Sequence, residues 1–347
     1  MSRFLSGVGT VLALELRQRV RARGWYILLG VYVLLIGIVT LLLSLSLGTF
    51  AGGDAGSGVL STIIYFVLLL GTLVTPALSG NAINGDRTDG TLATTQVTQI
   101  STGQLVVGKF VAAWVSALAF LAASVPFLLG AVLLGGVRAD TALVSIVVLA
   151  VELGVVAAIG VGLSGLLARP LFSIVVTYLV VAALSIGTLI LFTLAGLATQ
   201  STVTSTYRYA ESIDEDGDPV CSAVQEDTYT IPRFDPYWGV LVANPYVVLA
   251  DAVPTAFDDD GNPVDLFGFL KTGVRQAQIP PDLDVEYDDC AGEFPPSPTA
   301  QEIIERTVPG WFVGLGLHAL LAGGLLAAGW SATRTPARRL ARGSRIA

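Results

Sequence analysis

Six long apolar segments alternate with short polar segments along this chain. Each reaches the ~20 residues that a helix needs to cross a lipid bilayer. They comprise residues 25–47, 59–82, 108–135, 141–168, 171–199 and 309–331. Only Arg169 and Pro170 separate the fourth segment from the fifth, which predicts a very tight turn there. The pattern predicts an all-α polytopic membrane protein, with transmembrane helices one to five within residues 25–199 and the sixth at 309–331.

The first 24 residues follow a different pattern. Apolar side chains recur there at helical spacing among five arginines; they are Leu5, Val8, Leu12, Leu16 and Val20. This spacing predicts an amphipathic helix over residues 1–24. Two interpretations remain open for it. The helix lies along the cytoplasmic membrane surface, or the arginines are a simple cytoplasmic anchor for the first span.

Composition agrees with a membrane protein and excludes a soluble one. Of 347 residues, 53% are hydrophobic and only 13% are charged. The charged share is about half of the ~25% that is usual in soluble domains, so too little polar surface remains to cover such a domain. The net charge of −8 is a sum over compartments and describes neither side of the membrane by itself. Because His318 is the single histidine, a histidine-based metal site or catalytic triad within this chain is excluded.

The distribution of lysine and arginine predicts the orientation. Thirteen of these residues lie near one set of span ends and three near the other set. Basic residues collect on the cytoplasmic side of membrane proteins. We therefore expect both termini in the cytoplasm, with residues 332–347 as a basic cytoplasmic tail.

Residues 200–308 are then extracellular. This segment carries 21 acidic and 5 basic residues and is too long for a simple connection. We expect a small ordered acidic domain between the fifth and sixth spans, with a helix near 299–307 leading into the sixth. Both cysteines of the chain, Cys221 and Cys290, lie here, where an oxidising environment favours a disulfide. Such a bond would add roughly 3–5 kcal/mol in the chain-entropy model. The alternative is two free thiols.

Two motifs match nucleotide-binding patterns by letter only. Residues 103–109 follow the first seven positions of a phosphate-binding loop, but Phe110 stands where the magnesium-binding hydroxyl belongs. Lys109 is better interpreted as an anchor at the cytoplasmic end of the third span. Gly160, Gly162 and Gly165 have dinucleotide-motif spacing but lie inside the fourth span, where small residues allow close helix packing.

Glu152 and His318 lie well inside predicted spans, away from the span ends. Glu152 is near the middle of the fourth span, where a charge is costly. It is either a residue of a transport or coupling pathway or a neutral, hydrogen-bonded carboxyl that locks helices together. His318 in the sixth span is either a packing residue or part of a proton relay, and no partner for it is evident nearby in the sequence.

The loop after the second span has the most informative local pattern. It reads Asp86-Arg87-x-x-Gly90-Thr91-Leu92, and Gly108-Lys109 opens the third span. Asp86 and Arg87 predict a charged, water-exposed turn, and Gly90 permits a sharp reversal of the chain. Thr91 is expected to cap a short helix that a cytoplasmic partner could grip.

This loop resembles that of the permease subunits of ABC-2 type transporters. In that family the loop carries Glu-Arg-x-x-Gly-Thr-Leu, and Gly-Lys opens the third span. Here Asp86 replaces the glutamate, and the proline usual in the family's loop is absent. The tight turn at 163–170 and Asn244-Pro245 are also similar to the family, and the N-terminal helix looks like its connecting helix.

The resemblance implies a permease subunit of an ATP-driven transporter, most often an exporter, in the plasma membrane of a prokaryote. Such a chain is not an enzyme by itself and holds no metal or cofactor. A separate cytoplasmic ATPase binds ATP and magnesium, and a second permease copy or a paralogue completes the complex, with no nucleic acid. The residues implied to contact the ATPase are Asp86, Arg87, Gly90, Thr91 and Leu92.

Two other function classes remain as alternatives. The first is a non-transporting membrane sensor or scaffold whose extracellular domain binds a partner. The second is half of a secondary transporter, for which only Glu152 and His318 are available as coupling groups.

Overall fold

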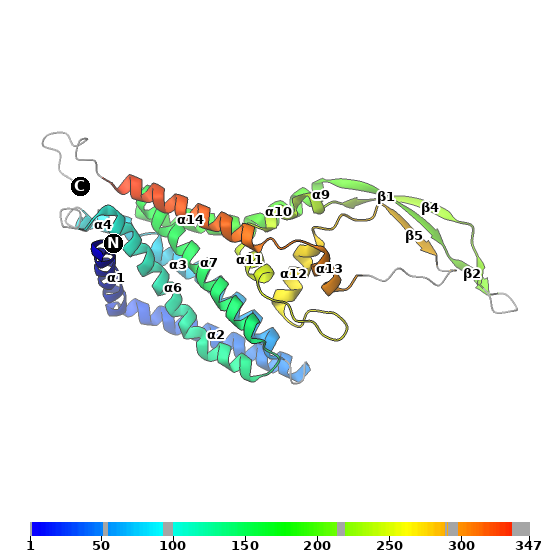
Figure 1. Cartoon of the computed structure of the whole chain (residues 1–347), viewed down its shortest axis with the longest axis horizontal. Helices are drawn as coiled ribbons and strands as arrows, with labels where there is room; N and C mark the ends of the chain where they lie inside the picture. The colour runs from blue at the N-terminus through cyan, green and yellow to red at the C-terminus, as the bar shows by residue number, and fades with distance from the viewer. Residues whose placement is uncertain are drawn as a thin grey trace.

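The computed structural model describes residues 2–50, 55–92, 100–213, 219–288, 290 and 298–334. A bundle of long helices continues at one end into an arm that carries all the strands of the described chain (Figure 1). We call that end of the bundle the sheet end. The opposite end carries the helix α1 (Ser2–Arg21) and the short helix α4 (Ala82–Thr88), and we call it the α4 end.

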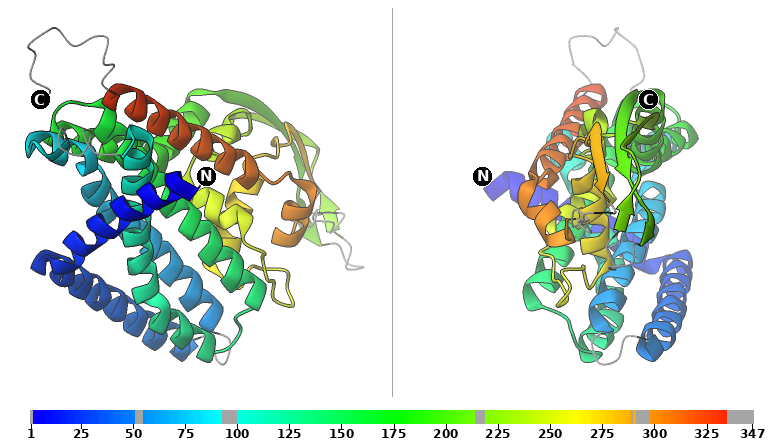
Figure 2. Two further views of the ribbon diagram at one scale, coloured as in Figure 1. Left: turned by 60° about the vertical axis from the view of Figure 1, so that its left-hand side comes forward. Right: turned by 90° about the vertical axis from the view of Figure 1, so that its right-hand side faces the viewer.

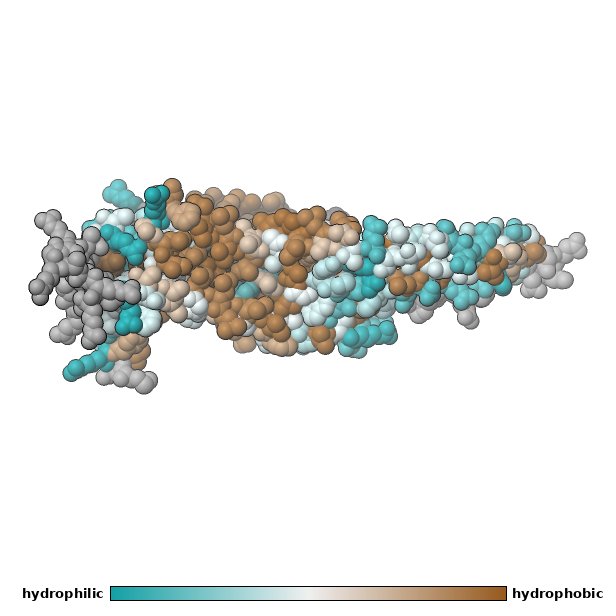
Figure 3. Space-filling model, turned by 90° about the horizontal axis from the view of Figure 1, so that it is seen from above, coloured by the Kyte–Doolittle hydropathy of each residue, from teal (hydrophilic) through white to brown (hydrophobic). Residues whose placement is uncertain are grey.

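Six helical segments of the described residues are long and apolar enough to cross a membrane, as predicted. They are α2 (Arg23–Phe50), α3 (Gly56–Ser79), α6 (Thr102–Leu133), α7 (Ala139–Leu166), the combined α8 (Pro170–Ala182), η2 (Ala183–Gly187) and α9 (Thr188–Ala198), and α14 (Trp311–Thr333). The short η2 is a π-helical turn inside the fifth span. Apolar side chains gather over this part of the molecule, whereas hydrophilic ones gather over the arm (Figure 3).

The core of the bundle lies around α3 and α7, which are the most buried spans. Apolar side chains such as Ile63, Leu68 and Leu149 are fully buried there. The spans α2 and α8–α9 instead expose most of their apolar side chains. Apolar surface of that extent is unfavourable in water and suits a lipid environment.

Glycines bring the backbones of α7 and α14 into direct contact. A methyl group added to Gly162 would lie 2.5 Å from the carbonyl carbon of Leu325, and one added to Gly329 would lie 2.5 Å from the oxygen of Gly162. Gly165 likewise faces the backbone of Gly329. The glycines of the fourth span therefore allow close helix packing, as predicted.

Substituting Gly162 by alanine should destabilise the bundle, because two backbones would have to move apart. We expect a loss of about 1–3 kcal/mol in the free energy of unfolding, the usual cost of overpacking. Gly316→Ala is the matched control in α14, since nothing lies within 4 Å of a methyl group added there. Thermal unfolding of the two variants in the same detergent measures the difference, and equal melting temperatures would contradict this packing.

The helix α1 lies crosswise to the spans at the α4 end (Figure 1) and packs against α6. Val8 and Val11 are buried, whereas Leu5, Leu14 and Val20 are more than half exposed. Figure 2 shows α1 passing across the bundle from two further sides. A helix therefore occupies Ser2–Arg21, with one apolar edge packed on α6 and another apolar edge exposed.

Strands occur in the segment between the fifth and sixth spans, which the all-α prediction did not foresee. The strands β1 (Gln200–Arg208), β4 (Gln225–Pro232) and β5 (Asp284–Asp288) form a sheet of order β4-β1-β5. β1 runs antiparallel to β4 and parallel to β5. A second pair joins β2 (Ala210–Ile213) and β3 (Pro219–Cys221). The run of threonine, valine and tyrosine in β1 favours this conformation.

Five short helices connect the sheet to the bundle. They are η3 (Asp235–Tyr237), α10 (Trp238–Leu241), α11 (Pro245–Ala252), α12 (Leu266–Gln276) and α13 (Ala300–Arg306). Thr299 caps α13, which confirms the helix predicted before the sixth span. Side chains of α11 and α12, including Val248, Leu249 and Phe267, belong to the same apolar cluster as Ile64 of α3. The base of the arm is thus part of the core of the bundle.

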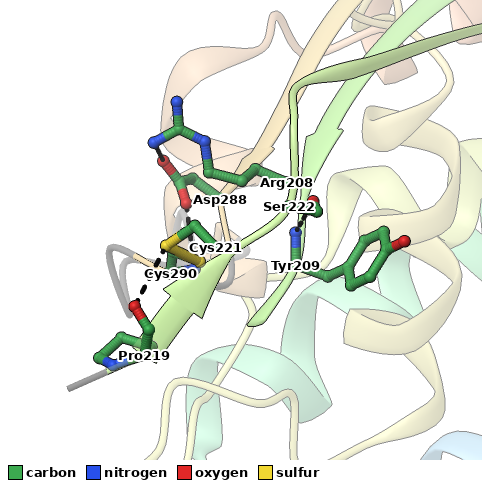
Figure 4. Close-up of a disulfide and its surroundings, with 7 residues drawn as sticks. All are labelled: Arg208, Tyr209, Pro219, Cys221, Ser222, Asp288 and Cys290. Atoms are coloured by element: carbon green, nitrogen blue, oxygen red, sulfur yellow. Dashed lines mark hydrogen bonds and ion pairs between the residues drawn. A yellow bond between two sulfur atoms is a disulfide. The ribbon is translucent and has the colours of Figure 1, made fainter. Parts of the chain in front are cut away.

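The disulfide between Cys221 and Cys290 is present (Figure 4). It joins Cys221, the last residue of β3, to Cys290, which lies two residues after the end of β5. Beside it, Arg208 lies 3.7 Å from Asp288, and Asp288 accepts a hydrogen bond from the backbone N–H of Cys290. The bond therefore links the two strand systems of the arm.

Candidate functional site

The first turn of α4 is held by hydroxyl groups of two other spans. The first N–H groups of a helix have no partner within the helix itself. Here the N–H groups of Ile83 and Asn84 donate to the hydroxyl of Ser164 on α7, at 3.0 and 3.1 Å. The amide of Asn84 donates to the hydroxyl of Ser173 on α8, at 3.1 Å. These contacts attach α4 to α7 and α8.

Arg87 attaches α4 to the turn between the same two spans. Its guanidinium donates to the oxygen of Asn84 at 3.0 Å and to the carbonyl oxygen of Leu167 at 3.2 Å. It also reaches the carbonyl oxygen of Gly165 at 3.5 Å. The last carbonyl groups of a helix are unpaired and carry partial negative charge, so a cation is favourable there. Arg87 therefore fastens α4 to the C-terminal end of α7.

Asp86 attaches α4 to the other side of the bundle through Lys109. The ammonium of Lys109 lies 2.7 Å from Asp86 and 2.5 Å from Glu15 of α1. The Lys109 side chain is only 2% exposed. Lys109 is thus the buried centre of an ion cluster rather than an anchor at the end of a span. Asp86 and Arg87 are half-buried and bonded inward, so the prediction of a water-exposed turn was wrong for these two residues.

The outer edge of the loop consists of Thr88, Asp89, Gly90 and Thr91, which are exposed. Gly90 has a φ of +72°, so the predicted reversal is present and uses the conformation that glycine adopts without strain. Leu92 is buried and packs in a small apolar cluster with Val11 and Leu105. The helix expected after Thr91 falls mainly on residues 93–99, outside the described residues. Of the five predicted contact residues, Gly90 and Thr91 therefore face outward.

A cavity of about 400 Å³ lies beside the ion cluster, between α1, α4 and α6. Glu15, Asp86 and Lys109 provide its polar wall, and Val11, Leu14 and Leu105 provide much of its apolar wall. Two carboxylates against one ammonium leave a net charge of −1 at this wall. The α4 site, which we define as Ala82–Leu92 with Glu15 and Lys109, therefore combines an exposed edge with firm internal attachments.

Glu152 and His318 meet in the interior of the bundle. The Nδ1 atom of His318 lies 3.0 Å from Glu152 Oε1, and both side chains are at most 2% exposed. The Nε2 atom lies 2.9 Å from the carbonyl oxygen of Ala243, in the chain before α11. Each residue is therefore the partner of the other, although 166 positions separate Glu152 from His318 in the sequence. The contact joins α7 to α14.

The side chain of the next residue, Asn244, contacts the π-helical turn of the fifth span. Its amide donates to the carbonyl oxygen of Ser185 at 2.6 Å and lies 2.9 Å from the hydroxyl of Thr188. A π-helical turn changes the regular helical bonding pattern and often marks a functional position. Ala243 and Asn244 thus connect the segment outside the spans to α14 and to the fifth span.

A second buried ion cluster fixes the beginning of α14 at the sheet end. Asp251 of α11 accepts hydrogen bonds from the N–H groups of Gly310 and Trp311, at 2.7 and 2.9 Å. Its other oxygen lies 2.7 Å from Arg275 of α12, which also donates to the carbonyl oxygen of Thr307. Asp251 therefore caps a span with a carboxylate that is itself held by a buried guanidinium.

Burial changes the acid–base behaviour of two neighbours of this cluster. Burial raises the pKa of the Asp265 carboxyl, although this group caps α12 by accepting from Gly268. Burial lowers the pKa of Lys271, whose ammonium donates to the carbonyl oxygen of Val253. Both effects arise because a charge loses its hydration when it is buried.

Sequence reasoning missed several residues that complete these sites. Glu15 is the only acid among the first 53 residues, and this isolation within an arginine-rich helix was a usable signal. Ser164 and Asn84 gave no such signal, because single hydroxyl and amide groups are common in spans. Within the described ranges, no group of three or more His, Cys, Asp or Glu side chains could hold a metal ion.

Comparison with known proteins found no relative of this chain. No protein-family model matches the chain, and no curated protein matches it.

Proposed function

We propose that this chain is the permease subunit of an ATP-driven transporter of the ABC-2 type, an exporter in the plasma membrane of a prokaryote. The observation that carries the proposal is the α4 site. A seven-residue helix is attached through named bonds to α1, α6, α7 and α8 at once, while its outer edge stays exposed. A displacement of this helix by a bound partner would be transmitted to all four of these helices.

Orientation supports this assignment. The excess of basic residues near the span ends at the α4 end favours a cytoplasmic position for that end. A cytoplasmic ATPase would then meet α4 directly. The acidic arm with its disulfide would lie outside the cell, where disulfides persist.

The mechanism follows from the attachments of α4. ATP and magnesium are held by the separate ATPase, whose movement displaces the edge formed by Thr88 to Thr91. Arg87 passes the displacement to the turn between α7 and α8, and Asp86 passes it through Lys109 to α6 and α1. Because packed helices shift as whole elements, this displacement changes which face of the bundle is open.

Reversing the charge of Asp89 should weaken binding of the ATPase without disturbing the permease. Asp89 is exposed at the outer edge of α4, so Asp89→Arg changes the contact surface alone. We expect about a tenfold loss of affinity, the usual scale of a displaced interface charge. Co-purification of the ATPase with each variant measures it. Asp259→Arg, an exposed charge reversal in the arm, is the control and should bind the ATPase normally.

The decisive experiment is purification of the complex from the native membrane, with identification of its subunits. We expect a cytoplasmic ATPase that lacks spans of its own and two permease chains per complex, either two copies or one copy and a paralogue. A neighbouring reading frame for that ATPase would agree. A chain that purifies without any ATPase would refute the proposal.

One observation favours a second function. The described part of the arm forms strands and helices, carries a disulfide and extends beyond the bundle (Figure 1), which suits a sensor or scaffold that binds a partner outside the cell. In that case removal of the arm's partner, and not of nucleotide, would change the state of the α4 site. Purification without an ATPase would favour this alternative.

A further inference from the structure

The hydrogen-bond geometry of Glu152 and His318 determines how many protons the pair holds. A backbone carbonyl only accepts hydrogen bonds, so the Nε2 atom of His318, 2.9 Å from the Ala243 oxygen, carries a hydrogen. The Nδ1 atom, 3.0 Å from Glu152 Oε1, needs one further hydrogen between the two atoms. That hydrogen belongs either to a neutral carboxylic acid or to an imidazolium beside a carboxylate. Both arrangements have zero net charge.

Removing the shared proton turns this contact into a repulsive one. A carboxylate oxygen would then face the lone pair of Nδ1, two acceptors with no hydrogen between them. The pair would carry a net charge of −1 while both side chains are at most 2% exposed. A buried, unpaired charge within a membrane span is strongly unfavourable. The contact between α7 and α14 at this level therefore requires one bound proton.

The position of the pair determines which part of the bundle depends on that proton. Towards the α4 end, the backbones of α7 and α14 touch at Gly162 and Gly329. Glu152 and His318 lie on the sheet-end side of this contact, and Asp251 fixes α11 to the start of α14 there. Separation of α7 from α14 at the sheet end, pivoting on the glycine contact, would bring water to the pair.

Other titratable groups near these elements already have partners. Tyr65 on α3 donates to the backbone of Tyr246 on α11, and the Tyr246 hydroxyl bonds to Thr72. Tyr178 on α8 donates to the backbone of Leu73, and Asp251 pairs with Arg275. The charged groups on α4 and at the start of α6, namely Asp86, Arg87 and Lys109, are engaged at the α4 end. Arg334 follows the last residue of α14 and stacks on Trp330 there.

We propose that Glu152 and His318 form a binding site for one proton, and that α7 and α14 separate at the sheet end when this proton leaves. The step is a simple acid–base reaction. The O–H or N–H bond between the two side chains breaks, the proton passes to water, and no other bond or redox partner is involved.

The sign of the pH dependence follows from counting protons. The closed bundle holds the shared proton, and in the open bundle the hydrated pair loses it. An imidazole in water releases its proton near pH 6.5, so above that pH the open state holds one proton fewer. The ratio of open to closed molecules then rises by up to tenfold per pH unit. Between about pH 5 and pH 6, above the ordinary pKa of a carboxyl group and below that of an imidazole, the two states hold nearly equal numbers of protons and this dependence disappears.

The chain offers a direct reporter of the proton, because His318 is its only histidine. Solid-state NMR of the chain labelled with ¹⁵N-histidine, in lipid bilayers, therefore detects this side chain alone. At pH 6 we expect a protonated Nε2 and an Nδ1 that shares a hydrogen. At pH 9 we expect a growing signal from an Nδ1 without hydrogen. An Nδ1 signal that is identical at both pH values would overturn the proposal.

Spin labels measure the separation itself. Leu143 near the start of α7 and Phe312 near the start of α14 are 65% and 55% exposed, so cysteines there can carry labels without repacking. The two native cysteines are bonded to each other and do not react. We expect a longer-distance population to increase severalfold between pH 6 and pH 9 in lipid nanodiscs. Distances that do not change with pH would overturn the proposal.

Two variants test whether the pair causes this change. The amide of Glu152→Gln can donate to Nδ1 without titrating, so its distances should be independent of pH. Asp259→Asn neutralises an exposed acid in the arm, outside both ion clusters, and should respond like the parent protein. Equal pH responses in Glu152→Gln and the parent would contradict the assignment. All these measurements use the chain without an ATPase, so their failure would leave the proposed function standing.

Discussion

Replacing Asp251 with alanine is expected to lower the free energy of unfolding by about 3–5 kcal/mol, the scale for breaking a buried ion pair. The variant leaves the Arg275 guanidinium, whose side chain is 5% exposed, without its carboxylate. It also removes the acceptor of two N–H groups at the start of α14. Both losses affect the contact between the arm and the start of α14. The arm and the sixth span should therefore be destabilised together.

Thermal unfolding in detergent, followed by the fluorescence of the tryptophans, measures this effect. Asp140→Ala is the matched control, since it breaks an ion pair with Arg138 in which both side chains are largely exposed. Exposed pairs contribute little, so its melting temperature should stay close to that of the parent. The double variant Asp251→Leu with Arg275→Met removes both charges and should recover much of the loss. Similar melting temperatures for Asp251→Ala and Asp140→Ala would contradict a stabilising role of the buried Asp251–Arg275 pair.

The second large effect is expected from Lys109→Met. This substitution leaves the carboxylates of Glu15 and Asp86 next to each other without the ammonium that lies within 2.7 Å of both. We expect a loss of about 3–5 kcal/mol, because two partly buried carboxylates lose the ammonium that they share. Since Asp86 belongs to α4 and Glu15 to α1, repulsion should detach α4 from α1 and α6.

Hydrogen exchange of the α4 amides and ATPase co-purification together measure this prediction. Faster exchange with weaker ATPase binding is expected in Lys109→Met. Adding Glu15→Gln and Asp86→Asn to the same chain removes the unbalanced charges and should slow the exchange again. Unchanged exchange in Lys109→Met would show that the ion cluster does not hold α4.

The same cluster changes how alanine variants at Asp86 and Arg87 are interpreted. Both side chains are bonded inward, to Lys109 and to the end of α7. A double alanine variant would therefore disturb the attachment of α4 as well as any contact with a partner. Asp89 is the better probe of the partner surface, because it lies on the exposed edge of the loop.

The predictions that succeeded depend on local pattern or on simple counting. The six spans follow from runs of apolar residues, because a bilayer imposes a minimum length on any helix that crosses it. The turn at Gly90 follows from one residue type that tolerates a positive φ. The disulfide follows from the presence of only two cysteines in one segment.

The sequence by itself thus determined that this is a six-span helical membrane chain with a long acidic segment before the last span. The tertiary structure decided which polar groups meet. Glu152 finds His318 across 166 positions, and Lys109 is enclosed by α1 and α4. Hydropathy measures the surroundings that a residue requires and contains no information on its partner. A charged residue in an apolar segment predicts only that a partner exists. The packing of helices that are distant in the sequence determines which residue that partner is.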